Sequence, residues 1–168
     1  MQVELCTGEY TIVGAVITRH ERLKDLLENY FHRFLPVKRA TIVPHHHRAR
    51  ANSEKVEEVM VRLDEVVLAM PHDDIPETER DRSSHSKYVP KYPVQAAVHL
   101  HAMVIEGQIF IREGEEAESA MMASRERFVV VKGAQVSYPY DDRLPSFAAE
   151  VVIVNRDHIQ LLRSSAAG

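Results

Sequence analysis

The sequence predicts a mainly β protein built from two small barrels in tandem, each carrying one short helix. Segments rich in β-branched residues recur in the same order in the two halves of the 168-residue chain, and such self-similarity indicates a repeated structural unit. A polar stretch with three prolines, residues 76–93, separates the halves and has the composition of a linker. We therefore expect a first module at residues 2–75 and a second at residues 94–163.

Three pairs of matching segments carry this repeat. They are residues 12–19 with 105–112, 33–42 with 127–136, and 65–69 with 150–154. The first pair shares Ile, Gly and Arg, the second shares Arg, Phe, Val, Lys and Ala, and the third begins with Glu-Val-Val in both copies. Gly14 precedes Phe34 by 20 residues and Gly107 precedes Phe128 by 21, so the first two spacings agree. The third spacing is longer in the first copy, which we interpret as an insertion at a hairpin tip, where chains tolerate extra length.

Each copy begins with a sequence typical of β-strands. Residues 11–18 and 104–111 are rich in β-branched side chains around a glycine that predicts a bulge or bend. Residues 3–6 predict a shorter strand before the first of these. Residues 34–43 and 128–136 alternate apolar and polar side chains, as half-buried strands do.

A helix is predicted after the glycine-containing strand of the first copy. Apolar residues there fall at i, i+3, i+4, i+7, i+8 and i+11 and so share one helix face. They are Leu23, Leu26, Leu27, Tyr30, Phe31 and Phe34. The second copy keeps the spacing with smaller residues, which are Ala117, Ala120 and Met121.

Residues 54–62 stay open between a strand and an inserted helix. Their apolar side chains fit a helical period, and Asn52 with Ser53 would cap such a helix. Residues 65–70 are predicted to form a strand, because they match residues 150–154 of the second copy. Each module then has the order β-β-α-β-(β)-β, and closure into a small barrel would remove the unpaired strand edges.

Several of these segments resemble a family of uncharacterised bacterial small β-barrel modules of the SH3-like or Sm-like type. The segments are Gly14, residues 22–27, residues 33–37 and residues 154–159. The resemblance covers both copies, although the second has Val130 in place of Pro36 and lacks the leucine-rich helix face. In the first copy, residues 70–75 take the place of the more regular closing turn of the family. The resemblance implies this fold and implies no activity, cofactor or partner.

Composition indicates a soluble cytoplasmic protein. Cys6 is the single cysteine, so no internal disulfide can form, and this fits a reducing compartment. No apolar run approaches the roughly 18 residues that a membrane-spanning helix needs, and Glu4 and Glu9 interrupt the segment where a secretory signal would be apolar. The net charge of −4 disfavours nucleic acid as a partner, because nucleic-acid binders usually carry a basic surplus.

Histidines are the most conspicuous candidates for metal ligands. Neighbouring residues of a strand point to opposite sides, so His45 and His47 could share an ion while His46 faces away. The alternative is an exposed polar loop at the tip of a hairpin. His99 and His101 also share one strand face, and simple solvent exposure explains them as well.

Four basic residues are candidates for binding a polyanion such as nucleic acid. Arg48 and Arg50 lie in a short basic segment beside the histidines. Arg33 and Lys38 recur at the same places in the second copy, so duplication would double their surface. The alternative is the solvent face of an alternating strand, where Arg and Lys are common, and no aromatic ladder for base stacking accompanies them.

No catalytic or cofactor signature stands out in the sequence. It has no Gly-rich phosphate loop, CxxC pair or HExxH motif. Asp157 and His158 form half of a catalytic dyad, but no serine or cysteine lies in a nucleophile-elbow context, so we interpret them as a hairpin turn. The predicted function is a non-enzymatic interaction or scaffold protein that binds a protein partner or itself and uses no cofactor. The alternatives are an Sm-like RNA-binding protein and a histidine-dependent metal-binding protein.

Overall fold

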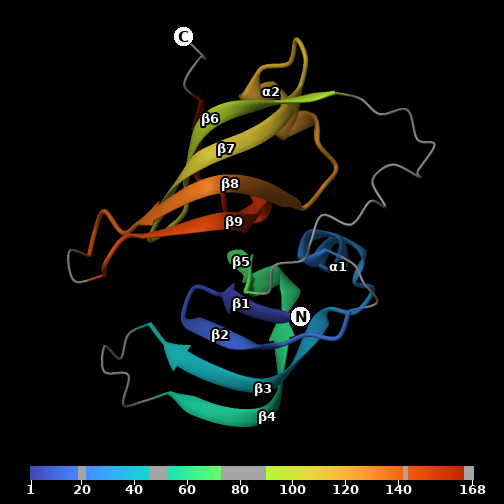
Figure 1. Cartoon of the computed structure of the whole chain (residues 1–168), viewed down its shortest axis with the longest axis vertical. Coiled ribbons are helices and arrows are strands. Elements are labelled where there is room, and N and C mark those ends of the chain that lie inside the picture. The colour runs from blue at the N-terminus through green and yellow to red at the C-terminus, as the bar shows by residue number, and fades with distance from the viewer. Residues whose placement is uncertain (19–21, 46–52, 73–89, 142–143, 165–168) are drawn as a thin grey trace.

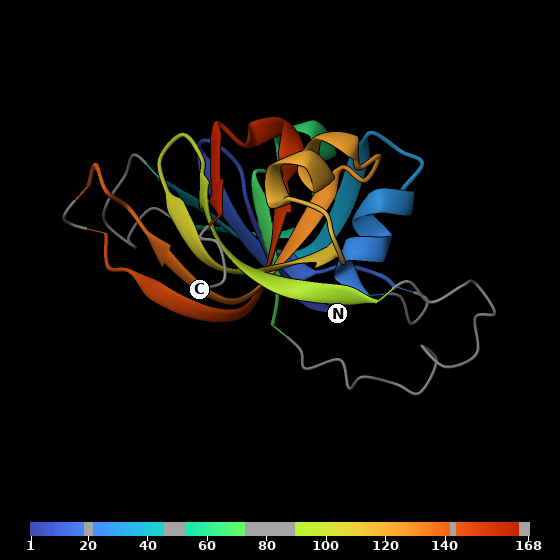
Figure 2. The same ribbon diagram turned by 90° about the horizontal axis from the view of Figure 1, so that it is seen from above.

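The computed structural model describes residues 1–18, 22–45, 53–72, 90–141 and 144–164. Within these residues the chain forms one antiparallel sheet of ten strands with two short helices (Figure 1). The strands are bent along their length, so the sheet is curved rather than flat (Figure 2). The expected mainly β class is confirmed.

Both halves of the chain contain the same succession of elements. The first half consists of β1 Gln2–Cys6, β2 Tyr10–Ala15, α1 Leu23–Asn29, β3 Phe34–Pro44, β4 Glu54–Arg62, the 3₁₀ turn η2 Leu63–Glu65 and β5 Leu68–Pro71. The second half consists of β6 Lys91–His99, β7 Val104–Arg112, α2 Ala117–Ala123, β8 Phe128–Ser137, β9 Phe147–Asn155, the 3₁₀ turn η4 Arg156–His158 and β10 Leu161–Ser164.

The sheet is continuous across the two halves. Its strands lie in the order β10-β6-β7-β8-β9-β5-β1-β2-β3-β4, so β5 of the first half joins β9 of the second. The sheet is not closed, which differs from the closed barrels that we expected. The physical reason is that β5 uses one edge for β1 of its own half and the other edge for β9 of the other half. Among the described residues, β10 and β4 therefore each pair with a single strand.

The strands of the two halves pair in the same register, 93 residues apart. β1 against β2 places Val3 opposite Gly14, and β6 against β7 places Ala96 opposite Gly107. The pairing of β5 with β1 matches that of β10 with β6 at the same offset. By the same comparison β9 is the counterpart of β4. The offset is 94 residues between the two helices and between the strands that follow them, β3 and β8.

Neighbouring strands approach each other closely at a glycine in each half. A Cβ atom added to Gly14 would lie 2.7 Å from Cγ1 of Val37, and one added to Gly107 would lie 2.7 Å from Cγ1 of Val131. Both glycines sit where the strand register shifts, as the sequence predicted from a glycine within a strand. The missing side chain is what allows β2 to approach β3, and β7 to approach β8.

We expect Gly107→Ala to lower the free energy of unfolding by about 1–3 kcal/mol, because the added methyl overpacks this contact. The methyl would lie 2.8 Å from the main-chain oxygen of Lys132, which cannot move without disturbing β8. Urea unfolding followed by circular dichroism measures the effect. Gly8→Ala is the matched control, because a Cβ there meets nothing within 4 Å. Equal stability of the two variants would contradict the close strand contact.

The two halves share their apolar cores. The core of the first half includes Phe128 and Ile153 from the second half. The core of the second half includes Cys6, Leu68 and Met70 from the first. Because apolar burial is the main favourable contribution to folding, each half stabilises the other.

Helix α1 is shorter than its apolar stripe predicts. Leu23, Leu26 and Leu27 are buried as expected, but the helix ends before Phe31, which is fully exposed. Phe34 begins β3, so the prediction of a helical face extending to this residue was wrong. Pairing of β3 with β2 and β4 overrides the local helical period, as tertiary context often does. Of the helices that the structure describes, none has the length and apolar character to cross a membrane.

Three predictions about strands are settled by the pairing. Residues 54–62 form strand β4 along β3, so the choice between strand and helix is resolved as a strand. The strand predicted at residues 65–70 begins only at Leu68, because the 3₁₀ turn η2 ends at Glu65. The match of residues 65–69 with 150–154 was wrong, since the latter lie in β9, the counterpart of β4.

The predicted linker, residues 76–93, overlaps a strand at its end. Strand β6 begins at Lys91, so residues 91–93 belong to the sheet. Pro93 has no N–H to donate, and it lies outside residues 96–99, the part of β6 that pairs with the described residues of β10. Residues 76–89 lie outside the described part of the chain.

Candidate functional site: the junction of the halves and the open sheet edges

The junction between the halves is a short antiparallel pairing of β5 with β9. Leu68 lies opposite Val154 and Ala69 lies opposite Ile153, and all four side chains are buried. The N–H of Asn155 extends the pairing by donating to a main-chain oxygen of the first half at 3.0 Å. The centre of the junction is therefore apolar and closed by main-chain hydrogen bonds.

Asn155 is the buried polar residue of this junction. Its side-chain Nδ2 donates to the main-chain oxygen of Val66 at 2.9 Å, and its Oδ1 accepts the N–H of Asp157 at 3.1 Å. Buried polar groups need such partners, because an unsatisfied one is costly. The side chain of Asn155 thus stabilises the turn η4 and holds it against the first half by a hydrogen bond.

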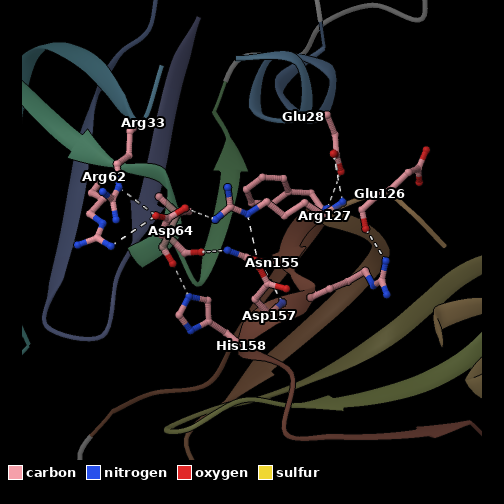
Figure 3. A network of polar contacts seen from close by, with 12 residues as sticks. Glu28, Arg33, Arg62, Asp64, Glu126, Arg127, Asn155, Asp157 and His158 are labelled. Atoms are coloured by element: carbon pink, nitrogen blue, oxygen red, sulfur yellow. Dashed lines mark hydrogen bonds and ion pairs between the residues drawn. The ribbon is translucent and has the colours of Figure 1, made fainter. Parts of the chain in front are cut away.

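Asp64, in the turn η2, is hydrogen-bonded to three arginines at the edge of the junction (Figure 3). Its carboxylate accepts a hydrogen bond from Arg127 of the second half, from Arg33 at 3.3 Å and from Arg62 at 3.5 Å. The hydrogen bond from Arg127 is the main reason that the pKa of Asp64 lies below its usual value. Nε2 of His158 also contacts the main-chain oxygen of Asp64 at 2.7 Å. This carboxylate therefore stays charged at neutral pH and links the two halves.

Helix α1 forms a second polar contact across the junction. The carboxylate of Glu28 accepts the N–H of Arg127 at 3.1 Å and the N–H of Phe128 at 2.5 Å. One turn earlier, Lys24 pairs with Glu126 at 3.0 Å. Both contacts attach the start of β8 to the helix of the other half.

Sequence reasoning missed Asp64, Asn155 and Glu28 as junction residues. A signal for Asp64 exists, because Asp64 and Asp157 lie 93 residues apart in corresponding turns. Matching β4 with β9 would have revealed it. No local signal points to Glu28, whose partners lie 99 and 100 residues further along the chain.

A groove of about 1210 Å³ is lined by residues of both halves. Lys24, Lys91 and Lys132 lie in its wall among acidic residues such as Glu115 and Glu150. Because both signs of charge line the groove, it does not select for a substrate of one charge. It therefore provides no assignment of a ligand.

The structure describes three of the four candidate metal ligands, which are His45, His99 and His101. His45 follows β3 and its Nε2 lies 2.8 Å from Oγ1 of Thr11, whereas His47 lies outside the described residues. His99 ends β6, and His101 is exposed just beyond it. Within the described part of the chain, no three His, Cys, Asp or Glu side chains are grouped to hold a metal ion.

Arg33 and Lys38 are the candidate polyanion-binding residues that the structure describes. Arg33 pairs with Asp64 beside the junction, and Lys38 is exposed further along β3. Of their second-half counterparts, one joins the junction and the other lines the groove. Arg48 and Arg50 lie outside the described residues.

Cys6 is buried, and Asp157 and His158 contact residues of the junction. Burial raises the pKa of the Cys6 thiol to about 12, so this side chain is neutral at physiological pH and a poor nucleophile. Asp157 pairs with Arg127 at 3.6 Å, and His158 contacts the junction rather than a reactive group. The hairpin turn predicted there was wrong, because η4 leads from β9 to β10, which pairs with β6.

Strands β4 and β10 form the two ends of the sheet, and each carries an exposed apolar side chain. Met60 of β4 is 52% exposed and Leu161 of β10 is 64% exposed. Phe34, opposite the end of β4, is exposed as well. An open edge presents main-chain N–H and C=O groups to another strand, and neighbouring apolar side chains favour such a contact.

Comparison with known proteins identifies no relative. The sequence matches no protein-family model, no curated protein and no solved structure.

Proposed function

We propose that this chain is a non-enzymatic interaction or scaffold protein of the cytoplasm that binds protein through its open sheet edges, β4 and β10. The observation that carries the proposal is that no described strand pairs with the outer edge of β4 or of β10, and that these edges bear exposed apolar side chains, Met60 and Leu161. Addition of a strand to an open edge is a common mode of protein recognition. Main-chain hydrogen bonds then give affinity, and side chains beside the edge give specificity.

The proposal includes a tandem duplication of one small-barrel module of the SH3-like or Sm-like type. The equal strand registers and the equal contacts at Gly14 and Gly107 support it. Each module has two strand edges, and the chain uses one edge of each to join the modules. The other edge of each module is left for a partner.

A photo-crosslinking amino acid at Met60 or at Leu161 is expected to give a discrete covalent adduct when cells that contain the protein are irradiated. The reason is that a strand bound at either edge would lie against these side chains. Mass spectrometry of the adduct identifies the bound protein. Tyr140, 86% exposed in the turn after β8, is the matched control position. If Met60 and Leu161 give no more adduct than Tyr140, the edges are not binding surfaces and the proposal fails.

A further inference from the structure

We propose that the partner at each open edge is a second copy of this chain, so that β10 of one copy pairs with β4 of the next. This inference rests on the proposed function, because it names the partner of the same two edges. The two surfaces that meet are different, so assembly is head to tail. Such assembly closes into a ring or grows as a filament, depending on the rotation between copies.

The junction inside the chain is the template for this contact. It joins the last strand of the first half, β5, to the fourth strand of the second half, β9. The open strands are the counterparts in the opposite halves, because β10 corresponds to β5 and β4 corresponds to β9. A second copy can therefore present to β10 the same kind of edge that β9 presents to β5.

Apolar side chains that are buried at the junction have exposed counterparts at the open ends of the sheet. At the junction, the exposed fraction is 1% for Leu68, 2% for Ile153 and 0% for Phe128. Their counterparts at the open ends are far more exposed: 64% for Leu161, 52% for Met60 and 44% for Phe34. The strands of the two halves pair alike, so the difference comes from the cover that one half gives to the other. At the open ends, a second copy would provide the missing cover and remove this apolar surface from water.

The charges of the junction also have counterparts at the open edges. Asp64 and Arg127 form an ion pair across the junction, and their counterparts are Asp157 and Arg33. The side chains of Asp157 and Arg33 are 72% and 62% exposed. Asp157 of one copy would meet Arg33 of the next, and opposite charges at the rim of an interface favour the correct register.

The Nε–H group of Arg62 is a hydrogen-bond donor without an acceptor among the described residues. Its Nε is buried and makes no hydrogen bond with any residue that the structure describes. Arg62 corresponds to Asn155, whose side chain donates to the main-chain oxygen of Val66. Ile159 corresponds to Val66, so Arg62 would donate to the main-chain oxygen of Ile159 in the adjoining copy.

The register of the proposed contact follows from the junction at the offset of 93 residues. Leu161 would lie opposite Val61 of the next copy, and Leu162 would lie opposite Met60, as the corresponding pairs do within the chain. The N–H of Arg62 would donate to the main-chain oxygen of Gln160, repeating the hydrogen bond that closes the junction.

Sedimentation velocity over a range of concentrations tests the inference. The wild-type chain is expected to sediment above the 19.2 kDa of one chain. Leu161→Glu and Met60→Glu each block one edge, so each variant alone is expected to sediment at the mass of one chain. Both substituted side chains are exposed, so the fold is kept, which thermal unfolding of each variant verifies. Leu161→Lys and Met60→Lys repeat the test with the opposite charge, and Tyr140→Glu is the exposed control that assembles like the wild type.

A wild-type chain that stays at 19.2 kDa at all concentrations would overturn the inference. So would a folded Leu161→Glu variant that assembles as the wild type does. If the wild type is monomeric but Met60 and Leu161 still crosslink to a different protein, the proposed function stands and self-assembly is excluded. If neither assembly nor crosslinks occur, both proposals fail.

Discussion

Phe128→Ala is expected to lower the free energy of unfolding by about 3–5 kcal/mol, as loss of a buried phenylalanine ring usually does. Phe128 is fully buried, and it lies in the core of the first half although it belongs to the second. Removing its ring leaves a cavity between the halves that the sheet cannot close without shifting β5 from β9. Urea unfolding followed by circular dichroism measures the loss.

Phe34→Ala is the matched control for this substitution. Phe34 corresponds to Phe128 but is 44% exposed, so the expected loss is no more than about 1 kcal/mol. Each substitution is made in a chain that also carries Leu161→Glu, because this second substitution prevents assembly and removes its contribution to the measured stability. Equal losses for the two substitutions would contradict the account of the junction, because they would show that the other half does not cover Phe128.

Met122→Glu is expected to tighten self-assembly at least tenfold. Met122 corresponds to Glu28, whose carboxylate accepts the N–H groups of Arg127 and Phe128 across the junction. A carboxylate at position 122 would accept the corresponding N–H groups of the next copy, which are those of Arg33 and Phe34. Each charge-assisted hydrogen bond contributes about 1.5–3 kcal/mol, and about 1.4 kcal/mol already corresponds to a tenfold change in dissociation constant.

Dilution of the assembly followed by mass photometry measures that dissociation constant. Met122 is 78% exposed, so the substitution leaves the fold of a single chain intact. Met122→Gln is the matched control, since its neutral amide is a weaker acceptor and gives a smaller gain. Unchanged or weaker assembly of Met122→Glu would show that α2 does not face the next copy, against the proposed register.

Strands β2, β3, β7 and β8 were predictable because their signals are local. Alternation of apolar and polar side chains marked β3 and β8, and glycines within apolar runs marked the bends at Gly14 and Gly107. The third sequence match, of residues 65–69 with 150–154, was wrong because it also rested on a local pattern alone. Glu-Val-Val suits any half-buried strand, but in the first half it spans the end of η2 and the link to β5, and only in the second half does it lie in a strand, β9.

The junction was not predictable from local patterns. Phe34 and Phe128 are the same residue at corresponding places, and they differ only in what covers them. Asp64 and its partner Arg127 lie 63 residues apart, so only the completed fold brings the charges together. The sequence marked Arg33 and Arg127 as recurrent residues, but their role at an edge of the sheet depends on which strands remain open.

Mixing the Leu161→Glu protein with the Met60→Glu protein tests most directly whether the two open edges are complementary. The first variant keeps a usable β4 edge, and the second keeps a usable β10 edge. We expect each alone to have the mass of one chain, 19.2 kDa, and the mixture to form a complex of one copy of each that grows no further. A mixture in which both proteins stay monomeric, or a variant that pairs with itself, would contradict head-to-tail assembly.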